Sequence, residues 1–292
     1  MKVCNSCGED IPGKQWVCPS CDFEPRLLEG YPAFAPELAS GNDGFQEDYF
    51  EQLERIEEGH FWFRSRNRLI LAALQRYFPD AGNFLEIGCG TGFVLSGLEQ
   101  ALPHLKLSGS EVSGGGLRSA SVRLRMATLF QMDARRIPFR DEFDVVGVFD
   151  VLEHITEDET VLSQIYRALG PGGGIIAIVP QHPLLWSSWD DISCHKRRYR
   201  RRELTAKMRR AGFKVILNTS FFTFLLPLMA LSKLGISRRA AKQNELNLSA
   251  AFAMPAPVDK LCEKICDLER GLLMRGLSFP FGGSRLCVGV KD

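Results

Sequence analysis

The sequence lacks a long hydrophobic run. None of its apolar stretches reaches the roughly 20 residues that a membrane-spanning helix needs. The opening Met-Lys-Val-Cys also lacks the apolar core of a signal peptide. These two absences argue against a membrane-spanning or exported protein, and we expect a cytoplasmic location. The 292 residues, of which 45% are hydrophobic, are enough for a full-sized core and a small accessory unit.

The sequence also lacks a strong net charge. Its formal charge is +1 at pH 7, which gives the whole molecule no general attraction for nucleic acid. Charge is nevertheless uneven, because residues 195–214 contain ten Lys and Arg against one acid, whereas residues 1–60 contain four basic and thirteen acidic residues. An acidic N-terminal region is poorly suited to clamp RNA. The basic stretch can meet phosphate on RNA, on a lipid headgroup or on a sugar nucleotide, or it can be a solvated helix face.

Cysteine, in contrast, is plentiful. Nine cysteines in a protein without an export signal favour reduced thiols and a metal over disulfides. Four of them have metal spacing: Cys4 and Cys7 form one Cys-x-x-Cys pair, and Cys18 and Cys21 form a second one ten residues later. Two such knuckles can offer four thiolates to a tetrahedral zinc ion, whose binding energy would fold this short segment. We predict a zinc ribbon over residues 1–29 with a structural or docking role, since a closed shell leaves no position for catalysis.

The sequence also lacks the complete glycine motif of a dinucleotide-binding site, which narrows the class of ligand. Residues 84–92 read Phe-Leu-Glu-Ile-Gly-Cys-Gly-Thr-Gly, a short strand that ends in three glycines. A dinucleotide fingerprint needs another small residue at position 93, where this sequence has Phe93. The turn therefore favours close approach of a ligand to the backbone but is not the usual pyrophosphate site. Glu111 and Asp133 follow, each after its own apolar run, and a carboxylate can accept hydrogen bonds from two hydroxyls or from an amino group.

These motifs, in this order, resemble the class I S-adenosylmethionine-dependent methyltransferases over roughly residues 83–216 plus the last strand. The resemblance implies that the glycine turn lies under the methionine part of the cofactor. It also implies that the first acid binds both ribose hydroxyls and that the second accepts from the adenine amino group. The residues that it assigns to cofactor binding are Glu86, Gly88, Gly90, Gly92, Glu111, Val112, Met132, Asp133, Ala134, Phe149 and Asp150.

The apolar runs alternate with helical stretches, as expected of a parallel sheet. Strands are predicted near 83–87, 106–111, 128–131, 143–149, 174–180 and 213–219. The resemblance adds an antiparallel last strand and implies a doubly wound, seven-stranded, mostly parallel α/β sheet of the Rossmann-like kind. The predicted units are a zinc ribbon (1–29), a linker with N-terminal helices (30–80), the core (81–219), a hydrophobic helical insert (220–284) and the last core strand (285–292).

The fourth predicted strand ends in Phe-Asp-Val-Leu-Glu-His, residues 149–154. This segment resembles methyltransferases that act on small molecules and lipid precursors. It lacks the Asn-Pro-Pro-Tyr type of motif that families methylating exocyclic amines of nucleobases often carry here. We predict a structural role for His154, because this histidine accompanies the motif across many substrates.

Candidate catalytic residues follow the fifth predicted strand. An oxygen or nitrogen acceptor usually has to lose a proton, and a histidine that titrates near a pH of about 6.5 suits that task. We predict His182, His195 and Tyr199 as catalytic residues, with an aspartate that orients the base. The alternative is a positioning network around Arg198 and Tyr199 without proton transfer. Before the first core strand, Trp62 and Arg66 are candidates to enclose the cofactor, whereas Phe61 and Phe63 are predicted to pack.

The long connection before the last strand is predicted to be an insert. Residues 221–231 are apolar but too short to cross a bilayer. Residues 258–274 read as an amphipathic helix with Leu261, Ile265, Leu268 and Leu272 on one side. An apolar lid beside a basic rim suggests an amphiphilic substrate or contact with a membrane surface through residues 196–236. A homodimer contact and a plain core helix are the alternatives.

The sequence thus predicts a methyltransferase that uses S-adenosylmethionine and a structural Zn²⁺ and acts on oxygen, ahead of nitrogen or carbon, of a small or amphiphilic molecule. One alternative is a ribosomal or transfer RNA methyltransferase. A zinc ribbon followed by a Gly-Tyr such as Gly30-Tyr31 also resembles the ribosomal-RNA guanine methyltransferases, although the acidic ribbon and the hydrophobic insert argue against it. A different class is a non-catalytic scaffold that keeps the cofactor without turnover.

Overall fold

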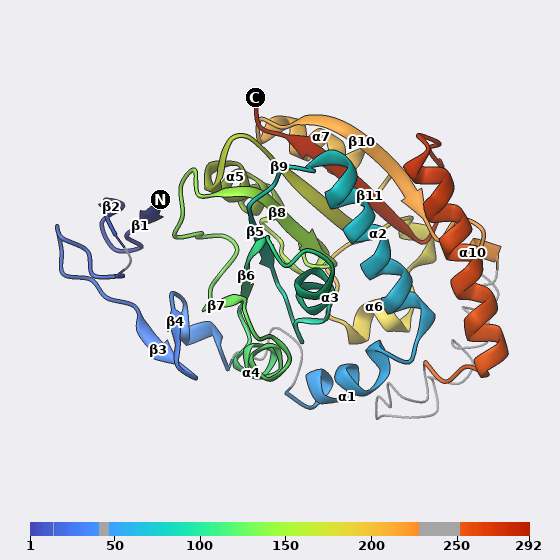
Figure 1. The fold of residues 1–292 in the computed structure, drawn as a ribbon, viewed down its shortest axis with the longest axis horizontal. Coiled ribbons are helices and arrows are strands. Elements are labelled where there is room, and N and C mark those ends of the chain that lie inside the picture. Colours follow the sequence, from blue (N-terminus) through green and yellow to red (C-terminus); the bar gives the residue numbers. More distant parts are fainter. Residues whose placement is uncertain (14, 41–46, 228–251) are drawn as a thin grey trace.

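The computed structural model describes residues 1–13, 15–40, 47–227 and 252–292. Its centre is a mixed sheet with helices packed on both faces, and the N-terminal segment lies beside one edge of that sheet (Figure 1). Two short strands near the N-terminus, β1 (Lys2–Val3) and β2 (Asp10–Ile11), form a separate antiparallel pair.

The strands of the central sheet are β3 (Arg26–Leu28), β4 (Tyr31–Ala33), β5 (Asn83–Ile87), β6 (Lys106–Glu111), β7 (Thr128–Gln131), β8 (Phe143–Phe149), β9 (Leu169–Pro180), β10 (Lys214–Phe221) and β11 (Ser284–Val290). The helices are α1 (Glu47–Glu57), α2 (Phe61–Tyr77), α3 (Phe93–Ala101), α4 (Gly114–Arg123), α5 (Asp158–Ala168), α6 (Ser188–Ile192), α7 (Glu203–Arg210) and α10 (Ala256–Met274). Three short 3₁₀ turns are η1 (Pro36–Leu38), η2 (Leu152–His154) and η3 (Pro183–Leu185).

The strand order of the sheet is β10-β11-β9-β8-β5-β6-β7-β4-β3. Strands β5, β6, β7, β8 and β9 are mutually parallel, and β11 lies antiparallel between β9 and β10. The seven strands from β5 to β11 confirm the predicted doubly wound core. The order reverses where β5 pairs with both β6 and β8, and ligands in such sheets bind beyond the carboxyl ends of the strands at this point.

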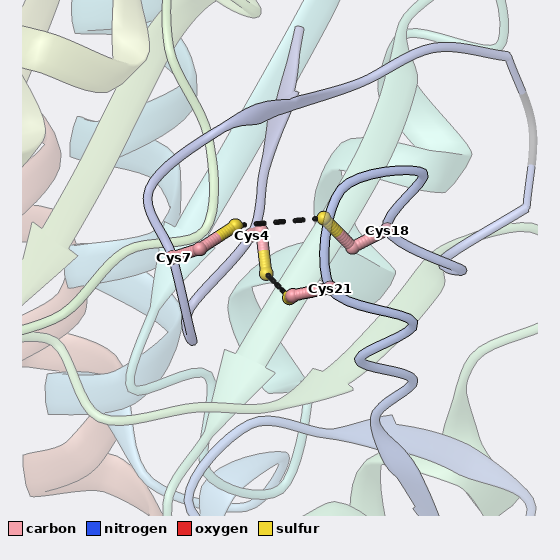
Figure 2. A group of neighbouring side chains, drawn as sticks. All are labelled: Cys4, Cys7, Cys18 and Cys21. Carbon is pink, nitrogen blue, oxygen red and sulfur yellow. Dashed lines mark hydrogen bonds between the residues drawn. The ribbon is translucent and has the colours of Figure 1, made fainter.

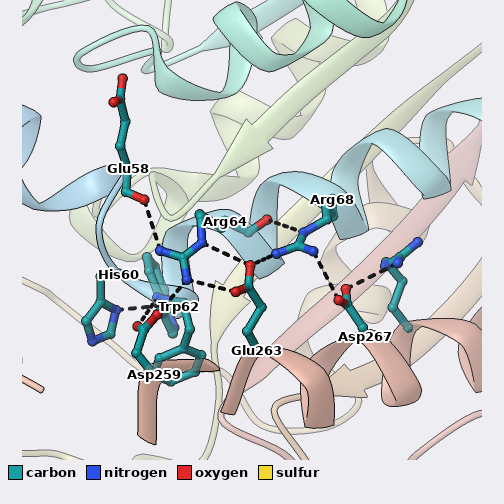
Figure 3. Close-up of polar contacts among 10 residues, drawn as sticks. Glu58, His60, Trp62, Arg64, Arg68, Asp259, Glu263 and Asp267 are labelled. Carbon is teal, nitrogen blue, oxygen red and sulfur yellow. Dashed lines mark hydrogen bonds and ion pairs between the residues drawn. The ribbon is translucent and has the colours of Figure 1, made fainter. Parts of the chain in front are cut away.

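Buried apolar residues form one cluster on each face of the sheet, because the central parallel strands are covered on both sides. Helices α2, α3, α4 and α10 contribute to the first cluster, and α5 and α7 contribute to the second. Strand β8 is typical of such a strand, since six of its seven residues are buried. Ion pairs also join α10 to α2, where Arg64 contacts Asp259 and Glu263 at 2.6 and 2.9 Å and Arg68 contacts Asp267 at 3.0 Å (Figure 3).

The segment predicted as a linker contains part of the sheet. Strands β3 and β4 form a hairpin, and β4 pairs with β7 through Ala33 and Gln131, so the described sheet has nine strands and not seven. The side-chain amide of Gln131 also bonds the backbone N–H and C=O of Ala35 at 3.0 and 2.7 Å. The boundary predicted at residue 29 is therefore wrong in position, because the hairpin crosses it and belongs to the central sheet.

The described part of the predicted insert contains helix α10. Helix α10 lies where a helix was predicted. Its buried residues include Cys262, Cys266 and Leu273, whereas Leu261 and Leu268 are 59% and 62% exposed. The side of the helix that carries Leu261 and Leu268 is therefore not the side that packs on the core, where the two cysteines lie. Residues 228–251 of the insert lie outside the described part of the chain. Among the described helices, none has the length and apolar character to cross a bilayer.

Candidate functional site

The glycine turn follows β5 at the point where the strand order reverses. Gly88, Gly90 and Gly92 have φ values of 68°, 51° and 75°, a backbone region that side chains with a Cβ rarely adopt. A Cβ on Gly88 would also lie 2.4 Å from the Val151 side chain. The turn therefore needs glycine both for its conformation and for the close approach of the segment that follows β8.

Glu111 closes the turn from the neighbouring strand. One of its carboxylate oxygens accepts from the N–H of Gly90 at 2.9 Å, and the other accepts from the N–H of Ser113 at 3.0 Å. Burial raises the pKa of Glu111, and these backbone hydrogen bonds oppose that rise. The predicted ribose-binding acid thus lies directly against the predicted cofactor turn.

Glu86 and Glu57 add two further carboxyl groups close to this turn. Glu86 is 3% exposed, and its Oε2 has no hydrogen-bond partner among the described residues. Burial raises the pKa of Glu86 well above its usual value, Arg66 opposes the rise, and the neighbouring charges of Glu111 and Glu57 add to it. Such a group of acids suits a ligand with cationic groups, and S-adenosylmethionine carries a sulfonium and an ammonium. The residues present therefore fit this cofactor.

Asp133 lies beyond the end of β7, next to the end of β6. Glu111 and Gln131 are paired in register, and the N–H of Met132 donates to the carbonyl of Glu111 at 3.3 Å. Asp133 accepts from Arg135 through both oxygens, at 3.1 and 3.0 Å. The flanking residues of the predicted adenine site are buried Met132 and Ala134, with Val112 39% exposed. The structure brings both predicted acids to the same edge of the sheet.

Asp150 lies beyond the end of β8, beside the turn. It has a φ of 53°, its N–H donates to the carbonyl of Ile178 at 2.9 Å, and its carboxylate pairs with Arg66 of α2. The guanidinium of Arg66 lies 4.7 Å from the ring centroid of Trp62. Arg66 therefore joins the site. Phe61, Phe63 and the site residue Phe149 are buried, as predicted for the first two.

Tyr199 does not lie in a position to act on a substrate. Its side chain is fully buried, and its hydroxyl donates to Asp158 at 2.6 Å and lies 3.2 Å from the carbonyl of Leu152. Burial and the neighbouring Asp158 carboxylate raise the pKa of Tyr199. The prediction of Tyr199 as a catalytic residue is therefore wrong, because its hydroxyl is used to fix the chain under the site.

His195 has the aspartate partner that the sequence analysis predicted. Its Nδ1 lies 2.9 Å from Oδ1 of Asp190, whose side chain is 0% exposed. Arg198 binds both oxygens of the same carboxylate, at 2.6 and 3.0 Å. Asp190 therefore orients His195, and Arg198 fixes Asp190.

His182 is placed less clearly for proton transfer. Its φ is 62°, its ring stacks on Phe281 with centroids 6.0 Å apart, and its buried Nε2 has no described partner. Burial lowers the pKa of His182, and the charges of Arg285 and Arg198 lower it further. The ring is thus neutral at pH 7, and its catalytic role stays a prediction.

The comparisons with known proteins now identify the family. Residues 57–218, more than half of the chain, match the model of a methyltransferase domain family. The chain belongs to this family. Its α/β fold is the one predicted from the resemblance to class I S-adenosylmethionine-dependent methyltransferases.

The methyltransferase has similar relatives of several kinds. A demethylmenaquinone methyltransferase of Symbiobacterium thermophilum is 32% identical over 169 residues, which are 55% of this chain and 64% of that protein. A Haemonchus contortus phosphoethanolamine N-methyltransferase, solved with S-adenosyl-L-methionine, has a TM-score of 0.57 at 19% identity, over 88% of this chain and 60% of that one. A Haloferax volcanii methyltransferase, solved with a methyltransferase activator, has a TM-score of 0.56 at 18% identity, over 84% and 95%. The chain spans 42% and 64% of the first curated relatives that it matches.

Helix α1 contributes residues to this methyltransferase that the sequence analysis missed. The ring of Phe50 lies 3.9 Å from where a Cβ of Gly90 would be and 2.9 Å from that of Gly116. Glu57 accepts from the Thr91 hydroxyl at 2.7 Å and pairs with Arg123 at 2.7 Å. The sequence carries no spacing signal for these contacts, because they join an N-terminal helix to a turn more than thirty residues away.

The four N-terminal cysteines of the methyltransferase converge. The Sγ atoms of Cys4 and Cys21 lie 3.6 Å apart, as do those of Cys7 and Cys18, and all four lie within 4.8 Å of one another (Figure 2). Tetrahedral zinc with bonds of about 2.3 Å places its sulfur ligands about 3.8 Å apart. The cluster is therefore compatible with zinc. The segment is anchored to the core where the N–H of Val3 donates to the carbonyl of Pro138 at 3.0 Å.

Proposed function

We propose that this methyltransferase transfers the methyl group to an oxygen of a small or amphiphilic molecule. The observation that carries the proposal is the polar group beside the glycine turn, where Asp150, Glu153, His154 and His195 gather at the end of β8. Carboxylates and imidazoles can bind and deprotonate a hydroxyl. The Asn-Pro-Pro-Tyr type of motif, which holds an exocyclic amine, is absent from this place.

The surroundings suit an acceptor with an apolar part. Trp62 stacks on Phe222 with centroids 5.9 Å apart, and Phe252 packs against Phe63 and Trp189 at 5.5 and 5.3 Å. These aromatic side chains come from α2, from α6 and from two places in the insert, Phe222 and Phe252. We propose that they form one wall of the acceptor site. The names of two relatives, a demethylmenaquinone methyltransferase and a phosphoethanolamine N-methyltransferase, are consistent with a small or amphiphilic acceptor.

The chain's residues have separate tasks in the transfer. When bound, S-adenosylmethionine supplies a methyl group on a sulfonium, whose positive charge is dispersed as the methyl leaves. The acids around the turn hold the cofactor, and Arg66 fixes Asp150 beside it. Alignment of donor and acceptor supplies much of the rate, about 7 kcal/mol or more of the barrier in well-oriented reactions. Glu153, His154 and His195, the last oriented by Asp190, form the group that binds the acceptor hydroxyl.

The four cysteines and the basic stretch also have roles in this proposal. Cys4, Cys7, Cys18 and Cys21 bind a structural Zn²⁺, which folds the ribbon. The basic stretch is partly neutralised, because Arg197, Arg198, Lys207 and Arg210 are paired with carboxylates. Its exposed members include Lys196 and Arg200, and they suit an anionic part of the acceptor or an anionic membrane surface.

The test is transfer of a radiolabelled methyl group to a cell lysate that is separated into lipid, small-molecule and RNA fractions. We expect label in the lipid or small-molecule fraction, and we expect NMR of the labelled product to identify a methoxy group. Glu111→Gln serves as the control with weakened cofactor binding. Label confined to RNA, or a product methylated on nitrogen or carbon, would refute the proposed acceptor. Absence of transfer from a protein that binds the cofactor would favour the scaffold alternative.

A further inference from the structure

Three side chains that can bind a metal meet beside the cofactor turn. Glu153 and His154 belong to η2 after β8, and His195 belongs to the loop after α6. Each offers one ligand atom, and these atoms lie within 4.8 Å of one another. The two imidazole rings meet edge to face with centroids 4.8 Å apart. The two segments are held together by a hydrogen bond from the N–H of Lys196 to the carbonyl of Glu153 at 2.7 Å.

Glu153 is the residue that most needs a partner. It is 0% exposed, and neither oxygen of its carboxylate has a hydrogen-bond partner among the described residues. A buried carboxylate without a partner is costly, so such groups are usually paired, protonated or bound to a metal. The nearby Arg66 and Arg198 are each engaged by another acid, Asp150 and Asp190 respectively.

His195 is already oriented as metal-binding histidines are. Its Nδ1 is bonded to the buried Asp190, which leaves Nε2 as the nitrogen for a ligand bond. Arg198 fixes Asp190 in turn through two bonds. Metal-binding histidines usually donate their other ring N–H to a carboxylate, a backbone carbonyl or water, and a carboxylate in this position fixes the ring and raises its basicity as a ligand.

The location connects the cluster to the reaction. Val151, which lies between Asp150 and η2, is the side chain that a Cβ on Gly88 would contact at 2.4 Å. The cluster therefore lies next to the turn predicted to hold the methionine end of the cofactor. It also lies apart from the four cysteines, which belong to the N-terminal segment with β1 and β2 beside one edge of the sheet (Figure 1).

We propose that Glu153, His154 and His195 bind one divalent first-row metal ion that keeps open positions for an oxygen of the acceptor. Two imidazoles and one carboxylate suit Mn²⁺, Fe²⁺ or Zn²⁺, and three protein ligands leave coordination positions free. This role rests on the proposed oxygen methylation. The acceptor hydroxyl loses its proton to solvent when its oxygen binds the metal. The oxygen then forms the bond to the methyl carbon, and the electrons of the breaking carbon–sulfur bond stay on sulfur as a neutral thioether. His195 is thus a metal ligand and not the general base.

Mn²⁺ is the probe that tests the site, because its preference for oxygen and nitrogen ligands keeps it from the cysteines. Full-length protein supplied with one equivalent of Zn²⁺ is titrated with Mn²⁺, and loss of the free-ion electron paramagnetic resonance signal reports binding. We expect one Mn²⁺ per chain for the wild type and at least about tenfold weaker binding for Glu153→Gln and His195→Ala. His104→Ala is the matched control, because His104 is exposed in the loop between α3 and β6.

Thermal unfolding with and without Mn²⁺ checks that each variant is folded. Glu153→Gln keeps the shape of the side chain and removes a buried charge, so we expect it to fold and to lose only the rise in Tm that Mn²⁺ gives the wild type. No Mn²⁺ binding by the wild type, or unchanged affinity in folded Glu153→Gln, would overturn the site. Metal binding without transfer to any hydroxyl would refute the proposed function and leave the metal site standing. Transfer to a hydroxyl that persists without metal binding would support the proposed function and refute the proposed metal site.

Discussion

Glu111 uses both carboxylate oxygens on backbone N–H groups beside the glycine turn. The same carboxylate is the one predicted to accept from the ribose. Glu111→Gln keeps the size of the side chain but removes the charge and part of its accepting capacity. We expect the Kd for S-adenosylmethionine to rise roughly 10- to 100-fold, since a hydrogen bond to a charged group is worth about 1.5–3 kcal/mol. Isothermal titration calorimetry measures this change.

Glu99→Gln is the matched control for that experiment. Glu99 also accepts from backbone N–H groups, those of Met126 and Ala127 at 2.8 and 2.9 Å, but these lie before β7 and away from the turn. We expect it to change stability and to leave the Kd for the cofactor within about twofold. An unchanged Kd in Glu111→Gln would contradict the assignment of Glu111 to the cofactor.

Asp158 makes stability depend on pH. Its side chain is 4% exposed and binds Lys207, Arg197 and Tyr199 at 2.5, 2.8 and 2.6 Å. Burial opposes ionisation, but these hydrogen bonds lower the pKa of Asp158 below its usual value. A folded-state pKa below the unfolded value of about 3.9 gives stability that is present above that value and is lost as the pH falls through the folded one.

The Asp158→Asn variant should therefore unfold more easily than the wild type above a pH of about 4. We expect a loss of about 3 kcal/mol in the free energy of unfolding at pH 7, because the buried cations are left unpaired. The difference from the wild type should shrink as the pH falls below about 4. Urea unfolding between pH 3 and pH 7 measures it. Glu159→Gln, at the exposed pair with Arg210, should have little effect at any pH. A difference that does not change with pH would contradict this account.

The sequence indicated that Gly88, Gly90 and Glu111 would lie together, because glycines after a strand favour a turn with positive φ and an acid at the end of the next parallel strand lies at the same edge of the sheet. Their roles in cofactor binding stay predictions. Tyr199 was misread because burial cannot be seen in a loop sequence, and its partner Asp158 lies 41 residues away. Phe50 was missed for the same reason.

At the element scale, the four-cysteine segment is the unit that we expect to depend on a metal for its folding. Cys18 is 0% exposed, and the N–H of Ser6 donates to the sulfur of Cys4 at 3.3 Å. We expect Cys18→Ser to lose the ribbon's zinc, because zinc supplies about 10–16 kcal/mol in comparable peptides. The ribbon should then be cleaved readily by protease, while cofactor affinity stays within about twofold, since β5 and β6 build that site.

Elemental analysis of the purified protein measures the bound zinc, and limited proteolysis measures the protease resistance of the ribbon. Cys266→Ala is the control, because Cys266 is also buried but lies on α10, outside the cluster. It should keep the zinc and the protease resistance of the ribbon. Cys18→Ser protein that retains stoichiometric zinc in a protease-resistant ribbon would contradict the four-cysteine site.

The elements that were predicted correctly are those with a strong local pattern. Strands β5, β6, β7 and β8 lie where their apolar runs predicted them. Strands β3 and β4 were not predicted, because three residues each carry too short a pattern and their stability comes from pairing with β7. The sequence did not indicate which side of α10 packs on the core, because that side carries Cys262, Cys266 and two acids, Asp259 and Glu269.

At the scale of the whole molecule, the N-terminal segment covers the edge of the sheet. Trp16 packs against Phe34, Phe130 and Phe139, with centroids 4.6, 6.0 and 5.5 Å away. The hairpin of β3 and β4 occupies the hydrogen-bonding edge of β7. An uncovered edge strand with apolar neighbours is a site of aggregation. The ribbon and hairpin together therefore stabilise the fold from the side opposite to the insert.

Two deletions test this cover. Removal of residues 1–40 takes away Trp16 and the hairpin, exposes Phe130 and Phe139, and leaves the buried amide of Gln131 without Ala35. We expect a loss of about 3 kcal/mol or more in the free energy of unfolding, because each buried aromatic contributes about 1.5–3 kcal/mol. We also expect this protein to aggregate, which size-exclusion chromatography detects. Removal of residues 1–13 keeps Trp16 and the hairpin, so this protein should stay monodisperse and bind S-adenosylmethionine. If the protein with the longer deletion is as stable and as soluble as the one with the shorter deletion, the hairpin does not protect the edge. Strand β7 would then be stable with β6 as its single partner.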